Sequence, residues 1–273
     1  MDRSKVTEEQ YEKKLKLETC IKGLGSLAVG FSGGVDSTFL LAVAHEVLGE
    51  KALAITQADD GVPGREVREA EEFCKGRGIR QVICHVDPLQ EEEYRFNGPK
   101  RCYVCKRGIF SEILRIAKEE GIEYVAEGSN MDDLGDYRPG LQAVAELHVT
   151  APLREAGLSK ADIRALSRAM ELPTWDKPAY ACLATRFSAG EEITKEKLHM
   201  VEAAEQFLID LGFKEERVRV HGDTARIEVP EKDIERLAKK DVRDRITEEF
   251  KKIGFVFVSL DLSGYRMGNM NRK

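Results

Sequence analysis

The sequence predicts an α/β protein with two domains, a larger one built on a parallel sheet and a smaller α+β one. Two observations lead to this prediction. In the first two-thirds of the 273 residues, short apolar runs alternate with amphipathic helical segments, as in parallel sheets with right-handed crossovers. Near the end of the chain the order changes to helix, strand, strand, helix, strand. We therefore expect the domains to cover residues 1–186 and 187–273.

The larger domain is expected to hold four strands, because four short apolar runs suit a sheet that is buried on both faces. The expected strands are 26–31, 51–58, 80–87 and 123–130. The segments around them repeat apolar residues at helical spacing. The expected helices are 6–23, 38–49, 63–78, 103–121 and 159–172. Gly49 is suited to end one helix, Pro63 to begin another, and Ser159 to cap a third.

Segment 173–193 interrupts this pattern with two prolines, a glycine and the only tryptophan, Trp175. It is typical of an ordered functional loop or of a segment between domains. The smaller domain follows. Its expected elements are a helix at 194–211, strands at 216–222 and 224–230, a long charged helix at 231–253 and a last strand at 255–262.

The composition indicates a soluble globular protein, with 42% hydrophobic and 34% charged residues. No apolar run approaches the roughly 20 residues that span a membrane. The first residues are charged and contain no apolar signal segment, so we expect a cytoplasmic protein whose thiols stay reduced. The net charge of −6 argues against a general nucleic-acid binder.

The strongest motif is AVGFSGGVDST at residues 28–38, where an apolar strand runs through a glycine-rich turn into a helix. Backbone N–H groups at such a turn bind anions. Gly33 and Gly34 allow close approach of the backbone, and Ser32 and Ser37 offer hydroxyl groups. Asp36 would repel a phosphate unless it held a magnesium ion.

This stretch, Phe31 to Ser37, resembles the PP-loop of the ATP pyrophosphatase superfamily, an adenine nucleotide alpha hydrolase-like fold. The resemblance implies that ATP is bound by its β,γ-pyrophosphate and that AMP is transferred to a substrate oxygen. The segment EGSNMDD at 127–133 would then lie at the carboxyl end of a strand, where open parallel sheets bind ligands. Gly128, Asn130 and Asp133, together with Ser129, could contact nucleotide or metal, although a polar turn is the alternative.

Five of the six cysteines fall into two groups. Cys20, Cys74 and Cys84 are expected to be small buried hydrophobes or inert thiols. Cys102 and Cys105 lie three residues apart among basic residues. Taken alone, this pair could form a disulfide, half a zinc site, a redox pair or two ligands of an iron–sulfur cluster. A reducing compartment argues against the disulfide, and the absence of a second close pair argues against zinc.

Three further stretches resemble the LarE family of ATP-dependent sulfur transferases. They are residues 135–164, 175–187 and 260–271. The resemblance runs nearly end to end. It implies that a carboxylate of a pyridinium dicarboxylate mononucleotide is adenylated and converted to a thiocarboxylate, a precursor of the nickel-pincer nucleotide cofactor. Cys182 matches the cysteine that supplies sulfur in one branch. With Cys102 and Cys105 it resembles the branch whose three cysteines hold a [4Fe–4S] cluster.

Basic residues are expected around the sulfur, because the implied substrate carries a phosphate and carboxylates. Arg186 lies four residues after Cys182, and further arginines lie on the two predicted strands of the smaller domain. These are Arg217, Arg219 and Arg226. Glu205, with Glu202, could orient these arginines or bind a metal, although a solvated helix face is slightly favoured.

These residues suggest a reaction in three steps. ATP and Mg²⁺ bind at Ser32–Ser37, the substrate carboxylate displaces pyrophosphate, and sulfur near Cys182 displaces AMP. Two other hypotheses remain: a PP-loop tRNA thiolase, and a module that senses adenine nucleotide or redox state without turnover. Family resemblance also implies a homo-oligomer. The lack of a long apolar run predicts no membrane partner, and the acidic balance argues against a nucleic-acid partner.

Overall fold

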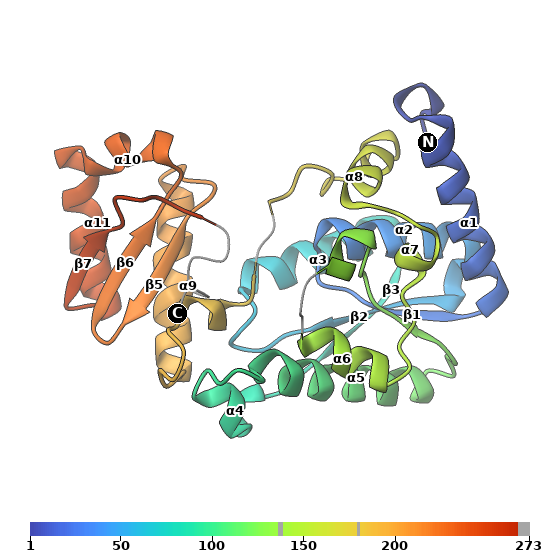
Figure 1. Cartoon of the computed structure of the whole chain (residues 1–273), viewed down its shortest axis with the longest axis horizontal. Helices are drawn as coiled ribbons and strands as arrows, with labels where there is room; N and C mark the ends of the chain where they lie inside the picture. The colour runs from blue at the N-terminus through green and yellow to red at the C-terminus, as the bar shows by residue number, and fades with distance from the viewer. Residues whose placement is uncertain (136–138, 179–180, 267–273) are drawn as a thin grey trace. The chain divides into compact units, whose positions relative to one another are not determined.

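The structure, a computed structural model, describes residues 1–135, 139–178 and 181–266. The chain divides into two compact units, each of which uses two stretches of sequence (Figure 1). Unit 1 comprises Met1–Pro88 and Cys102–Tyr180, and unit 2 comprises Leu89–Arg101 and Ala181–Lys273. The expected domains, 1–186 and 187–273, stay a prediction about independently folding parts of the chain.

Unit 1 contains the predicted parallel sheet, so the α/β fold class is confirmed. Four strands lie in the order β3-β2-β1-β4, and every neighbouring pair is parallel. They are β1 (Leu27–Gly30), β2 (Ala52–Gln57), β3 (Arg80–Cys84) and β4 (Val125–Ala126). Val29 lies opposite Ala54 on one side and Ala126 on the other, which places β1 between its two neighbours.

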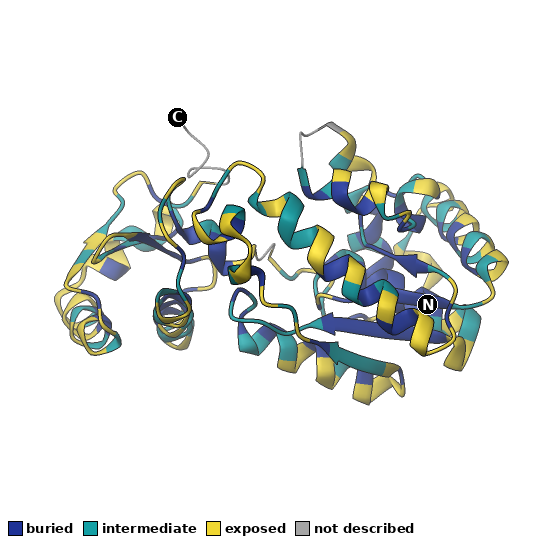
Figure 2. Ribbon diagram, turned by 90° about the horizontal axis from the view of Figure 1, so that it is seen from below, coloured by how far each residue is buried: buried dark blue, intermediate teal, exposed yellow. Residues whose placement is uncertain are grey.

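Helices cover both faces of this sheet, as Figure 1 shows. Side chains alternate along a strand, so Val29 faces one helical layer while the adjacent Ala28 faces the other. The first layer holds α1 (Glu8–Leu24), α2 (Val35–Leu48), α3 (Gly64–Arg77) and α8 (Lys160–Ala169). The second holds α5 (Arg101–Glu119) and α6 (Pro139–Glu146). β1, β2 and β4 are largely buried, whereas the edge strand β3 is mostly half-buried (Figure 2).

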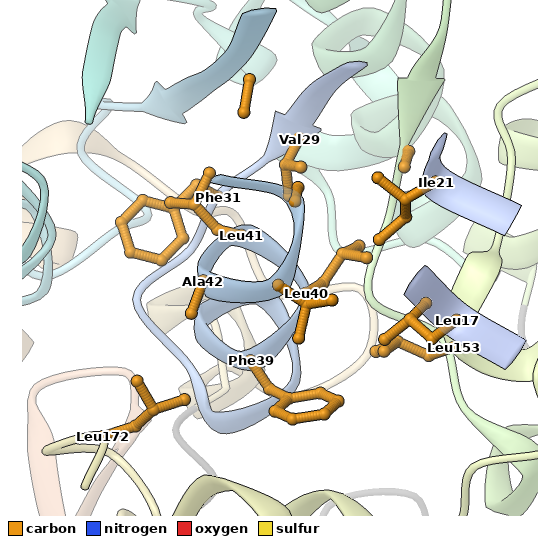
Figure 3. Packing of buried hydrophobic residues seen from close by; sticks show 14 of the residues in the cluster. Leu17, Ile21, Val29, Phe31, Phe39, Leu40, Leu41, Ala42, Leu153 and Leu172 are labelled. Atoms are coloured by element: carbon orange, nitrogen blue, oxygen red, sulfur yellow. The ribbon is translucent and has the colours of Figure 1, made fainter. Parts of the chain in front are cut away.

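The first layer packs around α2, whose side chains are buried along most of its length. Phe39 and Leu40 of α2 lie in one cluster with Leu17 and Ile21 of α1 and with Leu153 of the short helix α7 (Pro152–Glu155) (Figure 3). α2 begins at Val35, earlier than the expected residue 38, because Gly34 is extended and serves as the N-cap. Asp36 and Ser37 therefore belong to the first helical turn.

Unit 2 is the predicted α+β part, and its sheet is mixed. Helix α9 (Lys195–Asp210) is followed by β5 (Arg217–His221), β6 (Thr224–Glu228) and β7 (Phe257–Leu260). β5 and β6 are antiparallel, whereas β6 and β7 are parallel.

The expected long helix 231–253 is wrong, because the structure has two helices there, α10 (Glu231–Ala238) and α11 (Lys240–Ile253). Leu237 and Ile246 are both buried, yet they would lie about 180° apart around one continuous helix. Lys239 leaves the helical conformation with ψ 139°, and this break lets both side chains reach the core.

Several short elements were not expected. The short α-helices are α4 (Glu92–Arg95) and α7 (Pro152–Glu155). The 3-10 helices are η1 (Arg3–Lys5), η2 (Gly49–Lys51), η3 (Pro88–Gln90), η4 (Met131–Gly135) and η5 (Leu183–Arg186). Ser159 caps α8 as predicted. In the part of the chain that the structure describes, every helix is too short or too polar to span a membrane.

Candidate active site

The PP-loop of unit 1 connects β1 to α2 through a left-handed glycine. Gly33 has φ 68°, a conformation that a side chain would strain. The backbone N–H of Ser32 donates to Ser37 Oγ at 3.3 Å, and the two serine hydroxyls lie 3.1 Å apart. These contacts close the loop into a compact turn with hydroxyl groups at its mouth.

The loop ends at the N-terminus of a 14-residue helix, α2. Gly34 provides no side chain to cap the first backbone N–H groups. The partial positive charge of this helix end therefore remains available to an anionic ligand. This arrangement fits the phosphates of a nucleotide.

Asp36 is held at this helix end by a lysine from a distant part of the chain. One carboxylate oxygen, Oδ2, accepts from Lys160 Nζ at 2.5 Å, while Oδ1 is buried and has no hydrogen-bond partner. Burial raises the pKa of Asp36, and the Lys160 ammonium opposes this rise without cancelling it. A buried carboxylate oxygen without a partner fits the ligand set of a divalent cation.

The segment after β4 packs directly against the PP-loop helix. A Cβ atom at Gly128 would lie 3.2 Å from the backbone nitrogen of Ser37 and 3.3 Å from Asp36 Cβ. Asn130 and Asp133 bond to the backbone of their own segment, because Asp132 N donates to Asn130 Oδ1 and Asn130 N donates to Asp133 Oδ2, both at 2.9 Å. These two side chains thus shape the loop.

Phe31 differs from the other PP-loop residues in the direction of its side chain. The ring is buried in the core and lies 5.7 Å, centroid to centroid, from the ring of Phe73. Only the backbone of Phe31 remains to face a nucleotide.

Three charged residues beside the PP-loop were missed in the sequence. Lys160 bonds Asp36, and Lys177 Nζ donates to Gly33 O at 3.2 Å and to Glu66 Oε2 at 2.7 Å. Asp59 follows β2 at the same edge of the sheet, and burial raises its pKa to about 6. Lys160 and Lys177 lie within the LarE-like stretches 135–164 and 175–187, and Asp59 lies just after a strand, but none of these patterns indicates contact with the PP-loop.

In unit 2, Cys182 lies at the start of η5 and is exposed. Tyr94 Oη is 3.7 Å from the Cys182 sulfur, and Arg186 Nη1 donates to the backbone oxygens of Ala181 and Cys182. The sulfur is thus accessible on a turn that a buried arginine holds in place.

Arg186 and Glu205 form a buried bidentate ion pair, with both side chains 1% exposed. Arg186 Nε and Nη2 donate to the two Glu205 oxygens at 2.8 and 2.9 Å. Burial alone would raise the pKa of Glu205, but the guanidinium outweighs it and holds that pKa below its usual range. The favoured solvated helix face is therefore wrong for Glu205, since α9 turns this residue toward η5.

The arginines of the two predicted strands are also paired. Arg219 donates to Glu228 Oε2 at 2.8 Å, and Arg226 donates to Glu228 Oε1 at 3.0 Å. Arg217 is buried, with its guanidinium over the ring of Tyr265. Arg217 and Arg219 are therefore not solvated surface charges, and the cluster is built on buried carboxylates.

Cys102 and Cys105 lie one turn apart at the start of α5 in unit 1, whereas Cys182 belongs to unit 2. Within residues 1–135, 139–178 and 181–266, no group of three or more His, Cys, Asp or Glu side chains is arranged to hold a metal ion. Cys74 and Cys84 are buried as expected, and burial raises their pKa values to about 12 and about 11. Of the LarE-like stretches, residues 136–138, 179–180 and 267–271 lie outside the described residues.

Comparison with known proteins identifies relatives over nearly the whole chain. No protein-family model matches it. A Synechocystis protein of uncharacterized function is 39% identical, covering 94% of this chain and 97% of its own. The pyridinium-3,5-bisthiocarboxylic acid mononucleotide synthase of Lactiplantibacillus plantarum is 36% identical over 95% of this chain and 94% of its own. A tRNA-cytidine(32) 2-sulfurtransferase of Paracoccus denitrificans is 30% identical over 53% of this chain and 55% of its own.

The long match to the synthase agrees with the PP-loop on a parallel sheet and with the smaller mixed sheet that follows it. This chain is therefore an enzyme of the LarE-like family of PP-loop ATP pyrophosphatases.

Proposed function

We propose that this enzyme adenylates a carboxylate of a pyridinium dicarboxylate mononucleotide and then replaces AMP with sulfur. The observation that carries the proposal is the PP-loop, in which Gly33, the hydroxyls of Ser32 and Ser37, and the uncapped end of α2 surround one anion-binding turn. The 36% identity to the Lactiplantibacillus synthase supports this choice of substrate class.

The PP-loop residues would act by binding and by charge stabilisation. In the first step a substrate carboxylate oxygen attacks the α-phosphorus, and the bond to the pyrophosphate oxygen breaks. A free carboxylate has a poor leaving group, whereas the resulting acyl-adenylate can lose AMP. Asp36 Oδ1 would hold Mg²⁺, which supplies charge neutralisation on the phosphates when bound. Ser32, Ser37 and the N–H groups of α2 would position the pyrophosphate.

In unit 2, the arginine cluster and Cys182 would serve the second half of the reaction. Arg226 is partly exposed, with 28% of its side chain accessible, and could bind a substrate phosphate or carboxylate directly. Arg217, Arg219 and the Arg186–Glu205 pair would fix the shape of that site. Sulfur delivered near Cys182 would attack the acyl carbon, and the bond from that carbon to the AMP oxygen would break, releasing AMP.

We also propose that Cys102, Cys105 and Cys182 hold a [4Fe–4S] cluster. Cys102 and Cys105 lie one helical turn apart at the start of α5, so their side chains share a face, and Cys182 is exposed. These three thiolates would hold the cluster, which would supply the sulfur for transfer when bound.

Anaerobic purification followed by an absorption spectrum and by iron and sulfide analysis tests the cluster. We expect a coloured protein with about four irons per chain, and loss of iron in Cys102→Ser. A colourless, iron-free protein in which Cys182 loses its sulfur in a single turnover would instead support the sacrificial route. The adenylation itself is tested by incubating the enzyme with ATP and pyridinium-3,5-dicarboxylic acid mononucleotide and measuring the release of pyrophosphate and AMP.

A second candidate function is tRNA thiolation, which the matches to tRNA-cytidine(32) 2-sulfurtransferases favour over about half of the chain. A salt-sensitive shift of tRNA in a gel would support it. We further propose a cytoplasmic protein and, by family resemblance, a homo-oligomer. Sedimentation of the purified protein tests the assembly.

A further inference from the structure

A lysine on α8 lies at the mouth of the PP-loop. Lys160 is the first residue of α8, and its ammonium group contacts Asp36 Oδ2 across 124 positions of sequence. The Lys160 side chain is 34% exposed and that of Asp36 is 22% exposed, so a ligand can reach this ion pair. The pair therefore lies where the phosphates of a nucleotide would approach.

The backbone of Lys160 is fixed, so only its side chain can change partner. Ser159 and Asp162 form a capping box around the start of α8. The backbone N–H of Lys160 donates to Asp132 Oδ2 at 2.9 Å, which joins α8 to the segment after β4. The flexible four-carbon stem of a lysine lets its ammonium group move between two nearby acceptors while the helix stays in place.

A second cation on α8 supports the same edge of the loop. Arg164 lies one turn after Lys160 and donates to Trp175 O at 2.8 Å and to Lys177 O at 2.9 Å. Lys177 in turn bonds Gly33 O and Glu66. Arg164 and Lys177 thus hold the PP-loop in place through the backbone, whereas Lys160 contacts a side chain that a bound ligand could replace.

The charges near the loop show why a mobile cation is needed. The Asp133 carboxyl group lies close enough to Asp36 to raise the pKa of Asp36. A triphosphate that entered beside these carboxylates would be repelled, and an ammonium group that moved toward it would reduce that repulsion in addition to any bound Mg²⁺. When pyrophosphate leaves, further negative charge builds on its oxygens, and a nearby ammonium would stabilise that charge.

We propose that Lys160 is a further catalytic residue, whose ammonium group leaves Asp36 and contacts the phosphates of bound ATP during adenylation. This inference rests on the proposed function. Lys160 contributes charge and transfers no proton: the new bond joins the carboxylate oxygen to the α-phosphorus, and the broken bond releases pyrophosphate. Its positive charge lowers the barrier by stabilising that leaving group.

The test measures binding of inorganic pyrophosphate to the full-length protein by calorimetry, without divalent cations, and then the rate of AMP formation. We expect Lys160→Met to weaken pyrophosphate binding about tenfold and to slow AMP formation about a hundredfold. Lys160→Arg should recover part of the rate, because it keeps the charge. Lys13→Met is the matched control, since Lys13 bonds Asp162 of the same helix at 2.9 Å, away from Asp36.

A double-mutant cycle separates contact with phosphate from mere pairing with Asp36. If Lys160 binds phosphate, Lys160→Met weakens pyrophosphate binding in the Asp36→Asn background as well. Wild-type pyrophosphate affinity in Lys160→Met, or loss of its effect once Asp36 is Asn, would overturn the assignment. If wild-type protein forms AMP and Lys160→Met does so at the same rate, this inference alone is refuted. If wild-type protein binds neither ATP nor pyrophosphate, the proposed function is refuted as well.

Discussion

Asp36 and Glu205 are both largely buried carboxylates beside a cation, yet their pKa values shift in opposite directions. Glu205 has both oxygens bonded by Arg186 and accepts a further bond from the Val218 backbone. Asp36 has one oxygen on Lys160 and one without a partner. Full pairing stabilises the charge of Glu205, whereas Asp36 carries a charge that burial opposes. We infer that Asp36 is arranged to receive a ligand and Glu205 to maintain structure.

The first prediction concerns the PP-loop side chains. Asp36→Ala and Ser37→Ala should each reduce AMP formation by about a hundredfold or more, because each removes a group that would hold the phosphates or their metal ion. The measurement is release of pyrophosphate and AMP in the presence of substrate and Mg²⁺. Near-normal rates in both folded variants would show that nucleotide binds elsewhere.

The second prediction concerns the buried ion pair. Glu205→Gln should lower the free energy of unfolding of the protein by about 3–5 kcal/mol at pH 7, because it leaves the Arg186 charge buried and uncompensated. The pKa of Glu205 is depressed in the folded state, so its stabilisation is present above the ordinary value of 4.5 and is lost as pH falls through the folded pKa. Urea unfolding from pH 7 to pH 3 measures both effects.

Glu248→Gln is the control for this measurement. Glu248 pairs with Lys252 at 2.9 Å on the exposed surface of α11, where solvent screens the interaction. It should change stability little at any pH. Equal effects of the two substitutions would contradict the role assigned to the Arg186–Glu205 pair.

The strands and helices show which elements the sequence predicts well. The four parallel strands could be predicted because each is a short apolar run between polar turns. The break at Lys239 could not, because no proline or glycine marks it and only the burial of Leu237 and Ile246 requires it. Lys160 was missed for a similar reason: α8 meets the PP-loop through tertiary packing, which no local pattern reports.

The third prediction concerns the contact between α2 and the segment after β4. Gly128→Ala should weaken ATP binding, because its Cβ would press on Ser37 and Asp36 at 3.2–3.3 Å and displace the first turn of α2. Calorimetry with ATP and Mg²⁺ measures the affinity. Gly23→Ala is the control: it lies within α1, has no neighbour within 4 Å of a new Cβ, and should raise stability by about 0.5–1 kcal/mol without changing ATP affinity.

At the scale of the whole molecule, unit 2 is built from two separate stretches of the chain, Leu89–Arg101 and Ala181–Lys273. Asn97, from the first stretch, donates to Phe187 O at 2.8 Å and to Ser188 O at 2.7 Å in the second. Ile193 N also donates to Arg95 O at 2.7 Å. The smaller domain was expected to start after residue 186, and the sequence gives no sign that residues 89–101 join it, because these contacts depend on irregular backbone.

The fourth prediction tests this connection. Asn97→Gly should lower the free energy of unfolding by about 1–3 kcal/mol, because it leaves two backbone oxygens without their donor. Asn97 has φ 48°, so Asn97→Ala should cost more by adding backbone strain that glycine avoids. Hydrogen exchange should localise the loss to residues 181–193. An unchanged exchange rate there would contradict the assignment of Leu89–Arg101 to unit 2.

The two-stretch construction of unit 2 has a consequence for biosynthesis. The ribosome releases Leu89–Arg101 early, but the residues that cover Tyr94 and bond Asn97 emerge only after Ala181. The nascent chain must therefore carry this stretch uncovered while the larger unit forms, which would make it a natural target for chaperones. Messages truncated before codon 181 should yield products that proteases remove quickly.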